Sequence, residues 1–123
     1  MVKRTVRVRL QDILNAIDEI DGYLESPGYD AYERDQKTRR AVERCVEIIS
    51  EASRHIPLEL TDKFPNVPWA EMRAIGNFLR HDYQRVADHV IWRTATKHVL
   101  SLRQVIVEMM IQVERDEQGG DNS

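Results

Sequence analysis

Residues 10–24 read LQDILNAIDEIDGYL, and the spacing of their apolar residues decides the fold class. Leucine and isoleucine recur here in steps of three and four, at positions 10, 13, 14, 17, 20 and 24. This period places the side chains along one stripe of an α-helix. The helix is predicted to end at Ser26-Pro27-Gly28, because proline cannot continue the hydrogen-bond ladder and glycine tolerates a turn.

The same helical spacing predicts three further helices along the chain. The second runs from about 29 to 55, with these residues facing inward: Val42, Cys45, Val46, Ile49 and Ala52. A connection with three prolines follows, in which 58–64 is predicted to form a short helical turn. The third helix is predicted to begin with Pro68 at its first position, and its apolar stripe is Met72, Ile75, Leu79 and Val86. The fourth is predicted from about 88 to 113.

Long helices joined by short connections predict an all-α, up-down bundle of four to five helices. The pattern shows no alternating strand, repeat or low-complexity tract. At 123 residues the chain fits a single domain, predicted over 1–115. The polar residues 116–123 have nothing to bury, so we expect a disordered tail there.

Composition restricts the function classes. No apolar run approaches the roughly 18 residues of a membrane span, and no secretory signal opens the chain, so we expect a soluble, cytoplasmic protein. A single cysteine, Cys45, excludes an intramolecular disulfide and a cysteine-rich metal site. Its spacing matches the apolar residues around it, which favours a buried hydrophobe over a reactive thiol. Neither a metal nor a cofactor is expected.

Residues 68–83, PWAEMRAIGNFLRHDY, carry the side chains best suited to chemistry. On a helix, one polar strip opposite the apolar stripe contains Arg73, Asn77, Arg80 and Gln84. His81 and Tyr83 lie at its two borders. A histidine can move protons at neutral pH, and arginine offers a planar fork to a phosphate, so the strip suits a metal-independent phosphodiester site. A merely solvated helix face gives the same pattern.

The order and spacing of four blocks resemble HepT-like proteins of the HEPN superfamily. The blocks are residues 40–52 (RAVERCVEIISEA), 65–69 (PNVPW), 76–83 (GNFLRHDY) and 90–92 (VIW). The resemblance spans roughly residues 5–115. Agreement over several blocks is far more specific than any single motif.

The resemblance implies a dimeric helical bundle that acts as a metal-independent endoribonuclease toxin, with RNA, tRNA included, as its substrate. The family's hallmark is an arginine, four residues, a histidine, one residue and a tyrosine. By that pattern His81 matches the catalytic histidine, and Asn77 the polar residue after the arginine. Tyr83 matches the tyrosine to which a partner nucleotidyltransferase antitoxin attaches AMP, which silences the toxin.

The chain departs from this hallmark at one position. Gly76 stands where the family's arginine is expected, while Arg73 and Arg80 lie one turn away on either side. The guanidinium of either residue could reach nearly the same space as the expected arginine, and Arg80 is the slightly preferred candidate to replace it. The alternative is a catalytically impaired subunit that binds nucleotide or substrate beside the nucleotidyltransferase.

The spacing of the hallmark also carries a geometric requirement. An arginine and a histidine five residues apart lie about 140° from each other on an ideal helix. Therefore either the helix ends near Arg80 and His81, or residues from two chains converge across a two-fold axis. In the second case the third and fourth helices form the dimer interface.

Overall fold

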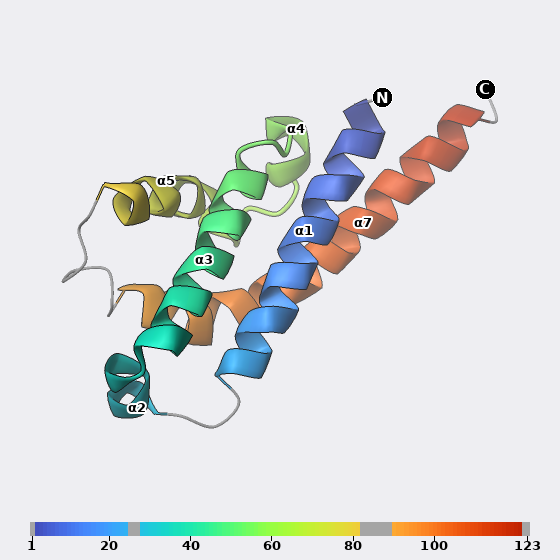
Figure 1. The fold of residues 1–123 in the computed structure, drawn as a ribbon. Coiled ribbons are helices and arrows are strands. Elements are labelled where there is room, and N and C mark those ends of the chain that lie inside the picture. Colours follow the sequence, from blue (N-terminus) through green and yellow to red (C-terminus); the bar gives the residue numbers. More distant parts are fainter. Residues whose placement is uncertain (1, 25–27, 82–89, 122–123) are drawn as a thin grey trace.

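The computed structural model describes residues 2–24, 28–81 and 90–121, and within these ranges it is helical and without strands (Figure 1). The elements are α1 (Val2–Tyr23), α2 (Tyr29–Arg34), α3 (Gln36–Ser53), α4 (Leu58–Thr61), α5 (Trp69–Arg80), the π-helical segment η1 (Thr94–His98) and α7 (Val99–Asp121). The predicted all-α bundle is confirmed.

The core lies between three long helices. α1 packs against both α3 and α7, and α5 packs against α3. In Figure 1, α1 and α7 lie side by side with opposite chain directions, so both termini are at the same end of the molecule. The predicted stripe of the first helix is at the centre: Leu10, Ile13, Ile17 and Ile20 are at most 1% exposed. Burial of these apolar side chains is the main stabilising term of the bundle.

The second predicted helix, 29–55, is in fact two helices that meet at Asp35. This residue has an extended backbone (φ −99°, ψ 92°) and caps the N-terminus of α3. Its Oδ1 accepts from the amide of Thr38 at 3.2 Å, and its Oδ2 accepts from the Thr38 hydroxyl at 2.7 Å. The first amides of a helix have no carbonyl partner within that helix, and the Asp35 side chain accepts from one of them. A new helix therefore begins at this residue, and the preceding one does not continue through it.

The proline-rich connection is shaped by α4 and by the indole of Trp69. The predicted short turn is present as Leu58–Thr61. Trp69 is buried, and its Nε1 donates to the carbonyl of Phe64 at 3.0 Å. Pro68 is the N-cap of α5 rather than its first residue. The start of α5 is therefore fixed by one indole hydrogen bond and by the proline before it.

The last helix is longer than predicted. Residues 90–93 are helical, η1 follows, and α7 continues to Asp121. The expected polar tail from 116 is thus helical as far as Asp121. Contacts within and beyond the helix explain this extension: Asp116 accepts from Gln112, and Glu117 pairs with Arg7 of α1 at 3.3 Å.

Candidate functional site

The site begins where α5 crosses α3 at Gly76. The Gly76 amide donates to the hydroxyl of Ser50 at 3.0 Å, and this hydroxyl donates to the carbonyl of Arg73 at 3.1 Å. Gly76 and Ser50 are both buried. A Cβ at position 76 would lie 2.8 Å from Ser50 Oγ and 3.1 Å from Ser50 Cβ. This position therefore admits no side chain while the two helices keep their distance.

The guanidinium of Arg80 lies beside Gly76. Arg80 Nε donates to the carbonyl of Gly76 at 3.3 Å, so the side chain folds back along its own helix by one turn. Arg80 Nη2 lies 3.8 Å from the point where a Cβ of residue 76 would be. A cation from the next turn thus occupies space beside the position where the resemblance expects the arginine.

Arg73 points elsewhere. Its Nη2 donates to the hydroxyl of Thr61, in α4, at 3.2 Å, and the side chain is half-buried. The structure does not bring Arg73 and Arg80 together, although seven residues of helix return them to nearly the same face. Arg73 holds α4 against α5, whereas Arg80 lies near the C-terminal end of α5.

The helix α5 ends at Arg80, and His81 is its C-cap. The His81 amide donates to the carbonyl of Asn77 at 3.1 Å, and the side chains of His81 and Asn77 are exposed. The first of the two geometric options, a helix that ends at Arg80 and His81, is thus observed. Tyr83, Gln84 and Val86 lie outside the residues that the structure describes.

Two further residues, which the sequence did not suggest, are Glu51 in the last turn of α3 and His55 just after the C-cap of this helix. The imidazole Nε2 of His55 is 3.2 Å from Glu51 Oε1, and Arg54 Nη1 is 3.9 Å from Glu51 Oε2. The pKa of the Glu51 carboxyl is lowered, chiefly by the hydrogen bond with His55 and further by Arg54 and Arg80. The four-residue spacing of Glu51 and His55 is a helical signal, but the electrostatic effect of Arg80 on Glu51 depends on the crossing of α3 and α5.

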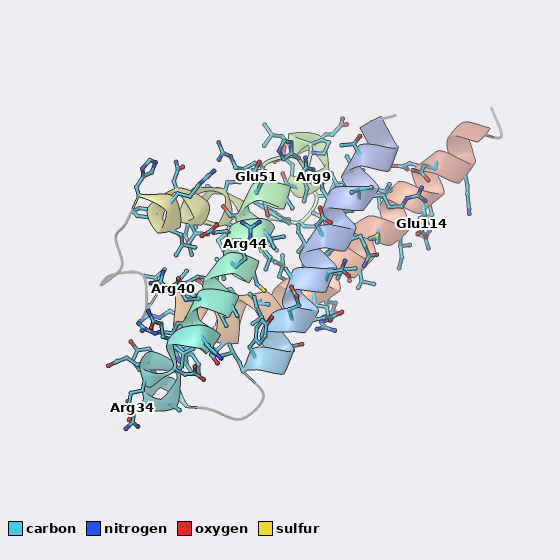
Figure 2. All side chains as sticks on the ribbon, in the orientation of Figure 1. Arg9, Arg34, Arg40, Arg44, Glu51 and Glu114 are labelled. Atoms are coloured by element: carbon cyan, nitrogen blue, oxygen red, sulfur yellow. The ribbon has the colours of Figure 1, made fainter. Side chains whose placement is uncertain are left out.

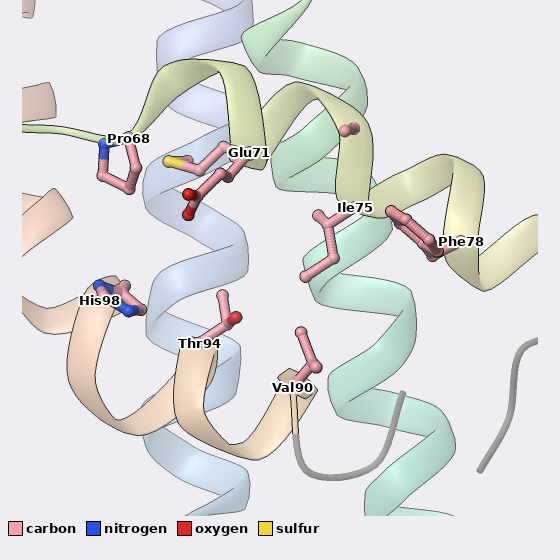
Figure 3. Close-up of a pocket in the computed structure, with 9 residues that line it drawn as sticks. Pro68, Glu71, Ile75, Phe78, Val90, Thr94 and His98 are labelled. Carbon is pink, nitrogen blue, oxygen red and sulfur yellow. The ribbon is translucent and has the colours of Figure 1, made fainter. Parts of the chain in front are cut away.

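An apolar cleft of about 290 Å³ lies between α5 and the helical residues 90–98. In Figure 3 the α5 side chains face Val90, Thr94 and His98 across it, with Ile75 in the middle and Phe78 at one end. Phe78 is 55% exposed and Val90 44% exposed, and both border this apolar cleft, so their exposed surface is continuous with it. This cleft is on the third and fourth predicted helices, which are the expected interface if residues of two chains converge.

Two further predictions concern metals and membranes. In the described part of the chain, no three histidine, cysteine, aspartate or glutamate side chains come close enough to bind one metal ion. None of the helices described here combines the length and the apolar character needed to cross a membrane. Cys45 is buried, as predicted.

Fold and site together define a small all-helical protein with a histidine and a guanidinium at the end of one helix. Residues 13–109 match the family model described as "Ribonuclease HepT-like". The chain therefore belongs to the HepT-like ribonuclease family, as the sequence blocks predicted.

Proteins similar to this chain carry ribonuclease names. "Putative RNase MJ1380" of Methanocaldococcus jannaschii is 34% identical over 106 residues, which cover 86% of this chain and 97% of the relative. "Probable ribonuclease HepT" of Thermococcus cleftensis is 35% identical over 102 residues, or 83% of this chain and 93% of the relative. No solved structure matches this one significantly.

Proposed function

We propose that the protein is a metal-independent endoribonuclease whose site is formed by His81 and Arg80. The observation that carries the proposal is the position of Arg80 Nη2, 3.8 Å from the missing Cβ of Gly76 and one residue from the exposed His81. Family membership and the ribonuclease names of the relatives support the same activity.

The reaction needs one proton removed and one proton delivered. As a base takes the proton of the ribose 2′-OH, that oxygen bonds to the adjacent phosphorus, and the P–O5′ bond breaks as an acid protonates the leaving oxygen. The products are a 2′,3′-cyclic phosphate and a 5′-hydroxyl. His81 can serve either proton transfer, because an imidazole ring can both accept and donate a proton. Arg80 stabilises the negative charge that develops on the phosphate oxygens.

Purified protein incubated with total tRNA in EDTA tests this activity. The expected result is cleavage to cyclic-phosphate ends by the parent and none by His81→Ala. Gln11→Ala is the control, because Gln11 is an exposed residue of α1, away from α5. Absence of cleavage by the parent over a range of RNA substrates contradicts the proposal.

The active form is proposed to be a symmetric dimer formed through the cleft between α5 and residues 90–98. Exposed Phe78 and Val90 beside an apolar cleft are surfaces that a second copy would cover. An isologous interface at this place brings the C-terminal ends of the two α5 helices toward each other, and with them both copies of His81.

Regulation by a nucleotidyltransferase antitoxin is the remaining part of the proposal, and it rests on the family pattern at Tyr83. AMP on this tyrosine adds a phosphate two residues from His81, where it competes with RNA for the Arg80 guanidinium. Co-expression with a nucleotidyltransferase encoded beside this chain, followed by mass spectrometry, is expected to show AMP on Tyr83. A Tyr83→Phe protein that is still fully neutralised contradicts this mode of silencing.

One observation favours a second candidate, a catalytically impaired partner subunit of the nucleotidyltransferase. Position 76, where the family's arginine is expected, is filled by the contact with Ser50 and cannot hold that side chain. An adduct on Tyr83 in a protein that cleaves no RNA would favour this role over the nuclease.

A further inference from the structure

Cationic side chains gather on α2 and α3, although the chain as a whole is acidic. Residues 34–44 contain five arginine or lysine residues and two acidic ones, while the net charge of the chain is −3. Residues 12–25, by contrast, contain five acidic residues and no basic one. Figure 2 shows Arg34 on α2, and Arg40 and Arg44 in order along α3. A polyanion that approaches the protein is therefore attracted to this segment and repelled by the first helix.

Three of these cations, Lys37, Arg40 and Arg44, form one row on the outer face of α3. Their spacing of three and four residues confines them to about 60° of the helix circumference and spreads them over about 10 Å of its length. All three residues are exposed, and the side chain of Arg44 is 71% exposed. The buried stripe of α3, which includes Val42 and Val46, faces roughly the opposite side. This cationic row is therefore accessible to a large ligand along its whole length.

The acidic residues nearest the cationic row are occupied by other contacts. The carboxylate of Asp35 accepts two hydrogen bonds at the N-terminus of α3. Glu47 pairs with Arg44 at 3.3 Å, and its side chain is only 29% exposed. Within the described residues, neither Lys37 nor Arg40 has a carboxylate at ion-pair distance. Both cations can therefore meet an external anion without first breaking an ion pair.

The cationic row begins close to the proposed nuclease site. α5 crosses α3 at the contact between Gly76 and Ser50, and Arg80 Nη2 lies 3.8 Å from the Cβ position of Gly76. Arg44 is six residues before Ser50, which is about 9 Å along the axis of α3. A nucleic-acid strand that is bound at Arg80 can thus continue along the outer face of α3 toward α2.

The character of this surface favours RNA over a protein partner. Protein interfaces have an apolar centre, whereas nucleic-acid interfaces are more polar and more positively charged. None of the large apolar side chains that are exposed in the described residues lies on α2 or α3. Two of the three cations in the row are arginines, whose planar fork suits a phosphate group.

We propose that Lys37, Arg40 and Arg44 bind the phosphate backbone of the RNA substrate, outside the bond that is cleaved. The inference rests on the proposed nuclease function and extends its site. Residues at the end of α5 act on the cleaved phosphate, and the cationic row on α3 holds the strand next to it. Because contacts with the backbone do not read bases, the row contributes affinity and no base preference.

Binding of fluorescently labelled tRNA in EDTA tests the proposal. The protein carries His81→Ala, which prevents cleavage during the measurement. Adding Lys37→Gln and Arg40→Gln together is expected to raise Kd about tenfold at low salt and to reduce the slope of log Kd against log salt by about one to two. The control is Lys63→Gln with Arg115→Gln, which removes the same charge from exposed positions near the two termini. An equal loss of binding in both double variants, or in neither, overturns the proposal.

Cleavage kinetics distinguish failure of this inference from failure of the proposed function. With His81 intact, Lys37→Gln/Arg40→Gln is expected to raise KM about as much as Kd and to leave kcat at saturating RNA unchanged. If RNA is cleaved and KM is unchanged, the row is not part of the substrate site, and the nuclease proposal stands without it. If tRNA binding depends on the row but no RNA is cleaved, the RNA-binding surface stands and the nuclease proposal fails.

A protein partner is the competing occupant of this surface. Co-purification with a nucleotidyltransferase encoded beside this chain measures that interaction for the parent and both double variants. We expect both variants to retain the complex. Loss of the complex in Lys37→Gln/Arg40→Gln, with full retention of tRNA binding, assigns the surface to the protein partner and overturns the proposal.

Discussion

At Gly76 the helices α3 and α5 approach so closely that a hydrogen atom is the only side chain that fits. The hydroxyl of Ser50 fills the space and bonds to the backbone of α5 on both sides, at 3.0 and 3.1 Å. The departure from the family hallmark is thus more than a lost arginine. It creates a tight helix crossing, and the cation beside it comes from Arg80.

We expect Gly76→Ala to destabilise the fold. The new Cβ would lie 2.8 Å from the buried hydroxyl oxygen of Ser50, which makes two hydrogen bonds. Overpacking of this kind lowers the free energy of unfolding by about 1–3 kcal/mol. Gly22→Ala is the control, because nothing lies within 4 Å of its added Cβ. Urea unfolding checks both variants. If Gly76→Ala is as stable as the parent, the two helices are not in close contact at this point.

Cys45 is expected to be unreactive in the folded protein. Burial, together with the hydrogen bond from its Sγ to Glu19 at 3.5 Å, raises the pKa of the thiol to about 12 from its usual 9.0. The thiolate fraction at neutral pH is therefore roughly a thousandfold smaller than for a free cysteine. Alkylation by iodoacetamide, followed by mass spectrometry, should be slow in buffer and fast in urea. Equal rates in the two conditions would contradict the burial of this side chain.

Sequence reasoning named both Arg73 and Arg80 as candidates and preferred Arg80 only slightly. Arg73 and Arg80 are equivalent on a helical wheel, and the difference between them depends on tertiary neighbours. Thr61 accepts a hydrogen bond from Arg73 across twelve residues, and Ser50 meets Gly76 across twenty-six. No local pattern encodes contacts at such separations.

At the scale of elements, Asp35 decides where α2 ends and α3 begins. Because its carboxylate accepts two hydrogen bonds from Thr38, we expect Asp35→Ala to lower the thermal midpoint and to fray the first turn of α3. Thermal unfolding followed by circular dichroism measures both effects. Asp12→Asn, within α1, is the control.

The same cap predicts a pH dependence. The hydrogen bonds from Thr38 hold the pKa of the Asp35 carboxyl below its usual 3.8. A lowered pKa in the folded state adds stability that is present above the usual value and is lost as the pH falls through the lowered one. The difference in midpoint between parent and Asp35→Ala is therefore expected at pH 7 and should shrink in acid below about 3.8. A difference that grows in acid would contradict the cap.

The helices themselves were predictable where their apolar stripe is strong, as in α1 and α3. The division at Asp35 was missed because the helical period continues on both sides of it, and a single capping residue leaves that period intact. The helical residues after 115 were missed for the opposite reason. Their sequence is polar, and the ion pair of Glu117 with Arg7 depends on the packing of α7 along α1.

For the whole molecule, the proposed dimer interface is the apolar cleft between α5 and residues 90–98. We expect the parent to be a dimer and Phe78→Ser to be a monomer of unchanged helicity, because Phe78 is 55% exposed at the edge of this cleft. Light scattering during gel filtration gives the masses. Leu58→Ser is the control, since Leu58 is 65% exposed but lies on α4. A dimer that survives Phe78→Ser places the interface elsewhere.

The bundle class followed from the sequence because every long helix has one apolar face, and only a few packings bury all of them. The direction of each functional side chain did not follow, because it depends on how α5 crosses α3. Ser50 contacts α5 only through that crossing, so no motif contains it.

The most direct test of the account is the rate of RNA cleavage in EDTA by Arg80→Ala and by Arg73→Ala, measured side by side with the parent. Because Arg80 lies beside Gly76 and His81 while Arg73 is bonded to Thr61, Arg80→Ala should lose roughly a hundredfold to a thousandfold in kcat. Arg73→Ala should keep most of its kcat and lose some stability. Full activity in Arg80→Ala, with activity abolished in a well-folded Arg73→Ala, would contradict the account.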